Sequence, residues 1–243
     1  MPINPDIPTP LYYQIKEIIK GDITEGRLQP QDQLPSETEL VREYGVSRMT
    51  VRQAILELVN EGLLYRKRGK GTFVARPKIT QGLYGLTSFT EDMEKRGLKP
   101  SGKVLALATV ALGKDVAGLL GIEPGAPAVR LERLRLADDQ PMALEISHLP
   151  LPRFEWILSE DLTGRSLYRL LREEHGVEFE RARQTIEVVV ATRYEAGVLE
   201  VNIGAPLLKM ERVAYDRKGE PVEAVKSTYR ADRYKFVMDL PRL

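Results

Sequence analysis

The chain has 243 residues and 42% hydrophobic content, which suits one or two globular domains and excludes a wholly disordered protein. It has no cysteine and two histidines, His148 and His175, so the sequence excludes disulfides and thiolate nucleophiles and argues against a metal centre or other cofactor. No apolar run approaches the roughly 20 residues of a membrane helix, and the N-terminus lacks the pattern of a secretory signal. We therefore expect a cytoplasmic protein without a membrane partner.

Positive charge is concentrated in one short stretch of the chain. Lys and Arg (36) nearly balance Asp and Glu (35) overall, but residues 42–77 hold eight basic and three acidic residues. Residues 1–41 hold three basic and seven acidic residues. A local basic stretch is typical of a surface that binds a polyanion. Charge alone leaves a solvated basic hairpin as an equal alternative.

Two helices are predicted in the first 45 residues. The first follows Thr9, which we expect to be its N-cap, and Pro10, and it ends at Gly26. After a loop, the residues Ser36-Glu-Thr-Glu39 form a capping box, in which the serine caps the helix and the glutamate bonds back to the cap. Gly45 ends this second, short helix.

A third helix is predicted from Ser47, its N-cap, to Gly62. Its apolar residues recur at i, i+3, i+4, i+7 and i+8 from Val51, which is the pattern of one buried face. Arg48 and Arg52 lie mainly off this face, near the N-terminal end. Two helices joined at a glycine turn, with polar and basic residues on the second, indicate a helix-turn-helix that enters the major groove of DNA.

A basic hairpin is predicted after the third helix, with strands at about 63–67 and 72–75. Arg68 and Lys70 lie in its turn, where glycines allow the backbone to approach DNA closely. Each piece has an ordinary alternative, since the arginines could be plain surface charges and the glycines a plain hairpin. The ordered combination favours a winged DNA-binding domain over residues 1–75.

Three segments carry a family signature: LPSETEL at 34–40, VSRMTVRQA at 46–54 and GKGTFV at 69–74. They resemble the GntR family of bacterial transcription regulators. The resemblance implies a winged helix-turn-helix in which Glu37 holds an arginine that touches DNA. It also implies DNA contacts around the recognition helix and in the minor groove, at Ser36, Glu37, Arg48, Thr50, Arg52, Gly71 and Thr72.

The rest of the chain repeats itself at an offset of 79 residues. Gly125-Ala-Pro127 matches Gly204-Ala-Pro206, and Glu132-Arg133 matches Glu211-Arg212. We expect a linker at 76–83 and an α+β domain at 84–243, made of two duplicated halves that form one mostly antiparallel sheet. Each half would hold a helix (about 88–96 and 166–175), a strand, a short helix (about 114–121 and 193–200) and a hairpin (about 128–149 and 207–230). The alternative is that shared turns punctuate unrelated elements.

A cleft between two such halves is a common place for a small ligand. Arg133 and Arg135 point to the same face of a strand, where two guanidiniums repel each other unless an anion joins them. Glu145 lies on the next strand, and Ser88 and Ser166 begin the main helices of the two halves. Singly, these could be an ion pair and two helix caps. Together they indicate a phosphorylated polar ligand.

Four further segments carry a second resemblance, at residues 85–93, 133–135, 141–145 and 226–234. They are similar to the UTRA effector domain of the HutC subfamily, whose fold is similar to chorismate lyase. Within that subfamily the sequence looks closest to repressors of N-acetylglucosamine use, which implies glucosamine 6-phosphate or N-acetylglucosamine 6-phosphate as effector. The pocket residues implied by the match are Ser88, Phe89, Thr90, Arg133, Arg135, Glu145, Ser166, Leu167, Tyr168, Glu223 and Tyr229.

We therefore expect a homodimeric transcription regulator that binds a pseudo-palindromic double-stranded DNA operator, with no catalytic residues. A small anionic effector, an amino-sugar phosphate, would bind the second domain and change operator affinity. A carboxylate effector is the alternative. A chorismate-lyase-like enzyme is the weaker alternative, because the sequence shows no pairing of a nucleophile with a base.

Overall fold

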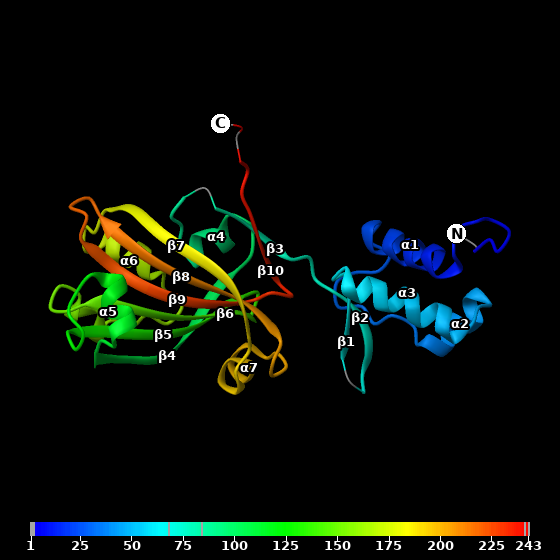
Figure 1. The fold of residues 1–243 in the computed structure, drawn as a ribbon, viewed down its shortest axis with the longest axis horizontal. Coiled ribbons are helices and arrows are strands. Elements are labelled where there is room, and N and C mark those ends of the chain that lie inside the picture. The colour runs from blue at the N-terminus through cyan, green and yellow to red at the C-terminus, as the bar shows by residue number, and fades with distance from the viewer. Residues whose placement is uncertain (1–2, 68, 84, 241, 243) are drawn as a thin grey trace. The chain divides into compact units, whose positions relative to one another are not determined.

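The computed structural model describes residues 3–67, 69–83, 85–240 and 242. The chain divides into two compact units, residues 1–78 and residues 79–243, each with its own core. Each unit is described by itself below, and Figure 1 shows their elements. The expected domain boundary at residue 84 lies outside the described residues, as does Arg68 in the expected wing.

Unit 1 consists of three helices and a hairpin. The elements are α1 (Leu11–Thr24), α2 (Glu37–Tyr44), α3 (Arg48–Asn60), β1 (Leu64–Lys67) and β2 (Gly71–Val74). β1 and β2 pair in antiparallel fashion, with Lys67 opposite Gly71. The buried apolar side of α3, including Val51, Ile55 and Leu58, packs with Ile15 and Ile19 of α1 into one core. This core holds the exposed side of α3 in a fixed direction.

The local signals for these helices are confirmed, with one exception. Ser36 and Glu39 form the capping box, Gly45 adopts a left-handed conformation (φ 64°), and Ser47 caps α3. The expected Thr9 cap is wrong. α1 begins at Leu11 with Pro10 in the N-cap position and no side-chain cap, because Thr9 stands one residue too early.

Unit 2 is built on a six-stranded antiparallel sheet in the order β4-β5-β6-β9-β8-β7. The strands are β4 (Pro100–Ala111), β5 (Pro127–Ala137), β6 (Gln140–Pro150), β7 (Phe179–Val190), β8 (Pro206–Asp216) and β9 (Pro221–Arg230). The helices are α4 (Phe89–Glu94), α5 (Lys114–Leu120), the 3₁₀ helix η1 (Glu155–Ser159), α6 (Leu167–Glu173) and α7 (Arg193–Leu199).

The strand order makes the predicted duplication visible. Each half runs helix, strand, helix, hairpin, and the two halves join at the antiparallel contact of β6 with β9. Both hairpins carry the same bulge, where the register shifts after Arg135 in one half and after Ala214 in the other. Because those two residues are 79 positions apart, the bulge repeats with the sequence offset.

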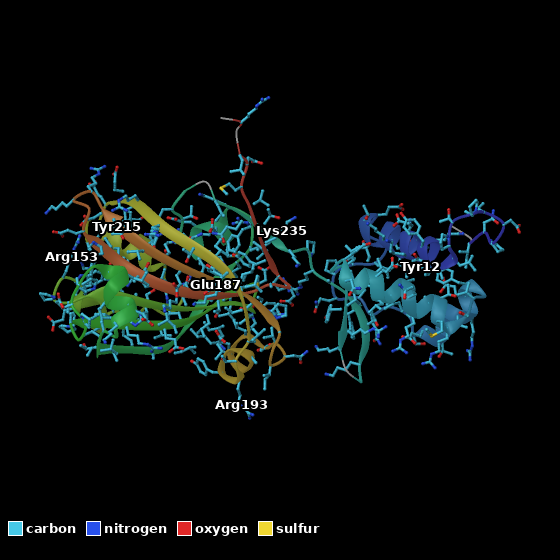
Figure 2. The ribbon with its side chains drawn as sticks, in the orientation of Figure 1. Tyr12, Arg153, Glu187, Arg193, Tyr215 and Lys235 are labelled. Atoms are coloured by element: carbon cyan, nitrogen blue, oxygen red, sulfur yellow. The ribbon has the colours of Figure 1, made fainter. Side chains whose placement is uncertain are left out.

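Helices cover both faces of the sheet (Figure 1). Phe89 of α4 packs with Met210 of β8, and Leu170 of α6 packs with Leu131 of β5. α5 and α7 pack on the other face. There, Leu120 of α5 is buried in one cluster with Val213 of β8, and Leu199 of α7 is buried in another with Leu207 of β8. Figure 2 places Arg153 and Tyr215 at the same end of the sheet, where Arg153 pairs with Asp216 over 2.8 Å between Nη2 and Oδ2.

The second half of the expected linker is a strand. β3 (Ile79–Gly82) pairs in parallel with β10 (Tyr234–Val237), so Ile79 lies opposite Tyr234 in a small second sheet. Ile79 and Tyr234 are buried in the same cluster as Phe89 and Met93. The chain therefore enters the packed body of unit 2 directly after Lys78.

Candidate DNA interface and ligand cleft

The exposed side of α3 carries the residues predicted to read DNA. Arg48 and Arg52 are exposed and Thr50 is half-buried, whereas Val51 between them is fully buried. This pattern follows from the helical period, which turns about three or four residues of every two turns toward the core. Unit 1 thus presents a basic helix side that the major groove of DNA can accept.

Glu37, at the start of α2, forms ion pairs with both the recognition helix α3 and the hairpin strand β1. Its Oε2 accepts from Arg48 Nε over 3.3 Å, and its Oε1 accepts from Arg66 Nη2 over 3.3 Å. Pairs this exposed contribute little stability, from about 0 to 1 kcal/mol. Their effect is to place two guanidiniums from different elements on one side of unit 1, and the predicted role of Glu37 in holding an arginine fits this geometry.

The backbone of the hairpin turn favours glycine at position 71. Gly71 has φ 121°, and a Cβ there would lie 2.7 Å from Gln33 Nε2. Gln33 in turn donates from Nε2 to the Lys70 carbonyl oxygen over 2.9 Å. Lys70 is exposed and Thr72 is half-buried. The turn is therefore a tight, basic projection whose backbone can approach a partner closely.

Two predicted DNA contacts also take part in helix capping, Ser36 as the cap of α2 and Thr50 as a partner of the α3 cap. Ser36 accepts from the Glu39 backbone N–H, and Thr50 Oγ1 lies 2.8 Å from the oxygen of the α3 cap, Ser47. Each of these side chains therefore stabilises a helix start, and this role does not depend on DNA binding. Their DNA contacts stay predictions.

Unit 2 contains a cleft on the sheet face that α4 and α6 cover, with a free volume of about 30 Å³. All eleven predicted effector residues line it: Ser88, Phe89, Thr90, Arg133, Arg135, Glu145, Ser166, Leu167, Tyr168, Glu223 and Tyr229. The N-caps of α4 and α6 lie next to each other in the cleft, since Ser166 Oγ lies 3.4 Å from Ser88 Oγ. The duplicated halves therefore build one shared cleft. The part of each residue in binding a ligand stays a prediction.

Arg133 and Arg135 share a single carboxylate in this cleft. Arg133 Nη2 lies 3.0 Å from Glu145 Oε2, and Arg135 Nη1 lies 3.4 Å from the same oxygen. Arg135 also donates to Thr90 Oγ1 over 2.9 Å and stacks over Phe89. Burial, reinforced by the nearby Arg135, lowers the pKa of Arg133 to about 10, which leaves the Arg133 guanidinium charged at neutral pH. Two positive charges thus face one negative charge.

The arginine pair keeps hydrogen-bonding capacity that the described residues do not use. Arg133 is 5% exposed and Arg135 3% exposed, and the Nε of each is buried. Among the described residues, neither Nε–H has an acceptor. A buried donor left unpaired costs about 1–3 kcal/mol, so an acceptor brought in by a ligand would be strongly favoured.

The second half contributes a polar cluster. Glu223 is 2% exposed and accepts from Tyr168 OH over 2.8 Å. Burial raises the pKa of the Glu223 carboxyl, and it raises the pKa of Tyr168 well above its ordinary value. Arg212 donates from Nε to Gln184 Oε1 over 2.8 Å and from Nη1 to the Thr87 carbonyl over 3.0 Å. The cleft can therefore offer both donors and acceptors to a polyhydroxylated ligand.

Comparison with known proteins identifies both units. Residues 11–74 match the bacterial regulatory proteins of the gntR family, and residues 95–235 match the UTRA domain. The HTH-type transcriptional repressor NagR of Bacillus subtilis (strain 168) is 44% identical over 245 residues, covering 100% of both chains. The chain belongs to the gntR family and carries a UTRA domain. It is a DNA-binding transcriptional regulator, as are the relatives it matches, and not an enzyme.

Other members of the gntR family extend the likeness to the whole chain. A probable fructoselysine utilization operon transcriptional repressor of Escherichia coli (strain K12) is 31% identical, with 96% of this chain and 95% of that one covered. The crystal structure of PhnF from Mycobacterium smegmatis has 32% identity and a TM-score of 0.66, with coverage of 95% and 98%. Among the described residues of this regulator, no helix is long and apolar enough to cross a membrane.

The cleft of this UTRA domain also contains residues that the sequence did not single out as ligand candidates. They are Gln81, Asp92, Ser147, Met210, Arg212 and Val225. A signal for Arg212 existed, because it is the repeat partner of Arg133. No local signal marked Gln81, since residues 76–83 show no periodicity of their own.

Proposed function

We propose that this regulator represses transcription from an operator and that a phosphorylated sugar, such as glucosamine 6-phosphate or N-acetylglucosamine 6-phosphate, binds in the cleft and lowers operator affinity. The observation that carries the proposal is the arginine pair with its two unpartnered Nε–H donors. A phosphate supplies several charged acceptors and suits two adjacent guanidiniums.

Charge supports an anion. Arg133 and Arg135 share Glu145, so that group keeps one positive charge in excess. Arg212 adds a third guanidinium to the lining, alongside the carboxyl groups of Asp92 and Glu223, whose pKa values burial raises. Glu223 and the hydroxyl groups of the second half would receive the sugar, and the relative named for fructoselysine utilisation supports a sugar derivative as effector.

Binding requires the cleft to widen. The lining side chains fill most of the cleft, which leaves a free volume of only about 30 Å³. A sugar phosphate is much larger than that free space, so side chains must move apart to receive it. A ligand that binds one arrangement better than another shifts the equilibrium between them, which is the requirement for control of DNA binding.

We also propose that the regulator acts as a homodimer on a pseudo-palindromic operator. Each chain carries one recognition helix, α3, with Arg48 and Arg52 exposed on it. Two helices related by a two-fold axis read two half-sites about one turn of DNA apart. Light scattering of the protein with and without a two-half-site duplex measures the stoichiometry, and one chain per duplex would contradict the proposal.

The test of the effector uses gel-shift titration with Arg135→Met. Glucosamine 6-phosphate should weaken operator binding of the unaltered protein by about 5–150-fold, the usual range of allosteric coupling. Arg135→Met should bind operator normally and lose this response, while the Arg133–Glu145 pair of 3.0 Å keeps the cleft folded. Arg153→Met, outside the cleft, is the matched control. A retained response in Arg135→Met refutes the phosphate site, and release by carboxylates alone would establish the alternative effector class.

A further inference from the structure

Gln81 reaches the ligand cleft from the segment that follows the DNA-binding unit. It is the third residue after Lys78, where unit 1 ends, and it lies on β3 opposite Phe236 of β10. Its side chain is 4% exposed and lines the cleft. A polar amide this buried normally uses all of its hydrogen-bonding atoms.

The hydrogen bonds of Gln81 determine which of its side-chain atoms has no hydrogen-bond partner among the described residues. Its Nε2 donates to Asp92 Oδ2 over 2.5 Å. The other Asp92 oxygen, Oδ1, accepts from Thr87 Oγ1 over 3.0 Å and lies 3.6 Å from Arg96 Nη1. Because a carboxylate only accepts, the amide nitrogen must be the atom that faces Asp92. The amide oxygen Oε1 is therefore buried, and no donor among the described residues reaches it.

The surroundings hold Gln81 in place. β3 is paired with β10 along its length, and Arg96 donates from Nε and Nη2 to the Thr80 carbonyl oxygen over 3.1 and 2.9 Å. The same Arg96 donates to the backbone carbonyl of Asp92. With its backbone and its amide nitrogen both fixed, Gln81 has little freedom to turn Oε1 toward another partner. A fixed acceptor of this kind is preorganised for a ligand.

We propose that Gln81 binds the effector directly, with Oε1 accepting a hydrogen bond from an O–H or N–H group of the ligand. The inference rests on the proposed function and deepens it, because it defines the ligand chemistry. The arginine Nε–H groups need an acceptor and Oε1 needs a donor, so the ligand carries both an anionic group and hydroxyl or amino groups. Inorganic phosphate satisfies the arginines, but its only donors are the P–O–H groups on the phosphorus itself, whereas a sugar phosphate also carries separate hydroxyl or amino groups that can reach Gln81.

Calorimetric titration of the full chain tests this, with glucosamine 6-phosphate and inorganic phosphate as the two probes. Gln81→Met keeps the length of the side chain and removes the acceptor. We expect its Kd for glucosamine 6-phosphate to rise at least about fivefold, while the Kd for inorganic phosphate stays within about twofold. Gln140→Met, at the β5–β6 turn outside the cleft, is the matched control and should match the unaltered protein for both probes.

Three outcomes overturn the inference. Unchanged binding of both probes removes Gln81 from the contact set, and equal weakening of both shows that it only supports the fold. If the unaltered protein binds no phosphorylated sugar, the proposed function fails and this inference fails with it, which is distinguishable from a failure of Gln81 alone. Should Gln81→Met not fold, Gln81→Asn keeps the amide but withdraws it by one methylene, and it should show the same selective loss.

Discussion

Gly71 allows a quantitative test of the wing, because its backbone conformation and the nearby Gln33 side chain both make an added side chain unfavourable. Its φ of 121° is a conformation that other residues rarely adopt, and an added Cβ would lie 2.7 Å from Gln33 Nε2. Gly69, two residues earlier, is the matched control. It also has a positive φ, 72°, but nothing lies within 4 Å of its Cβ position.

The two substitutions differ in expected cost. Gly71→Ala combines backbone strain of about 1–3 kcal/mol with loss of the Gln33–Lys70 hydrogen bond, about 0.5–1.5 kcal/mol. We expect the free energy of unfolding of unit 1 to fall by about 2–4 kcal/mol. Gly69→Ala carries only the left-handed backbone cost of about 1–2 kcal/mol. Adding Gln33→Ala to Gly71→Ala removes the clash, so the two changes should be non-additive.

Urea unfolding of the full chain distinguishes the two units, because Trp156 is the only tryptophan and belongs to unit 2. Gly71→Ala should move the far-UV circular dichroism transition of unit 1 and leave the midpoint of Trp156 fluorescence unchanged. Operator affinity of the folded variant should fall as well, since the turn is displaced. If Gly71→Ala is no more destabilising than Gly69→Ala, the close approach of Gln33 does not restrain the wing and the reasoning is refuted.

The elements that could be predicted from the sequence are those with local signals. The helices at Ser36 and Ser88 begin as expected, and the repeated Gly-Ala-Pro turns precede equivalent strands β5 and β8. β3 was missed for a physical reason. It has four residues, and it pairs with β10, more than 150 residues away, so nothing in its own composition fixes its structure.

The same distinction applies to the cleft. The predicted set came from strand alternation and from family resemblance, and both place Arg133 and Arg135 on one face, as the structure does. Gln81 depended on the pairing of β3 with β10, which is a long-range contact. Residues brought to a site by such a contact carry no periodic signal, whereas Arg212 could have been found by extending the repeat from Arg133.

Duplication explains the framework of the cleft, and divergence between the halves explains its polarity. Arg133 and Arg212 are repeat partners and both line the cleft, but Arg135 corresponds to Ala214. The second arginine is therefore absent from the second half, and Glu223 lies there opposite Ala214 in the β8–β9 register. A symmetric fold thus holds an asymmetric site, with excess positive charge on one side and a buried carboxyl on the other. A ligand with distinct anionic and polyhydroxyl ends suits that asymmetry.

Two further tests address the two units separately. Arg52→Ala should weaken operator binding by about 1–3 kcal/mol if Arg52 reads a base, whereas Arg42→Ala on α2 should have little effect; equal affinities in a gel-shift titration would exclude Arg52 from the contacts. In unit 2, burial, with help from the nearby charges of Arg130 and Lys226, lowers the pKa of His148 from 6.5 to about 4. Because the unfolded chain binds a proton to this group more readily, the stabilising contribution is complete above pH 6.5 and declines as the pH falls toward 4. His148→Gln should flatten the pH dependence of the Trp156 unfolding midpoint in that window, and an unchanged slope would show that His148 is not kept neutral by its surroundings.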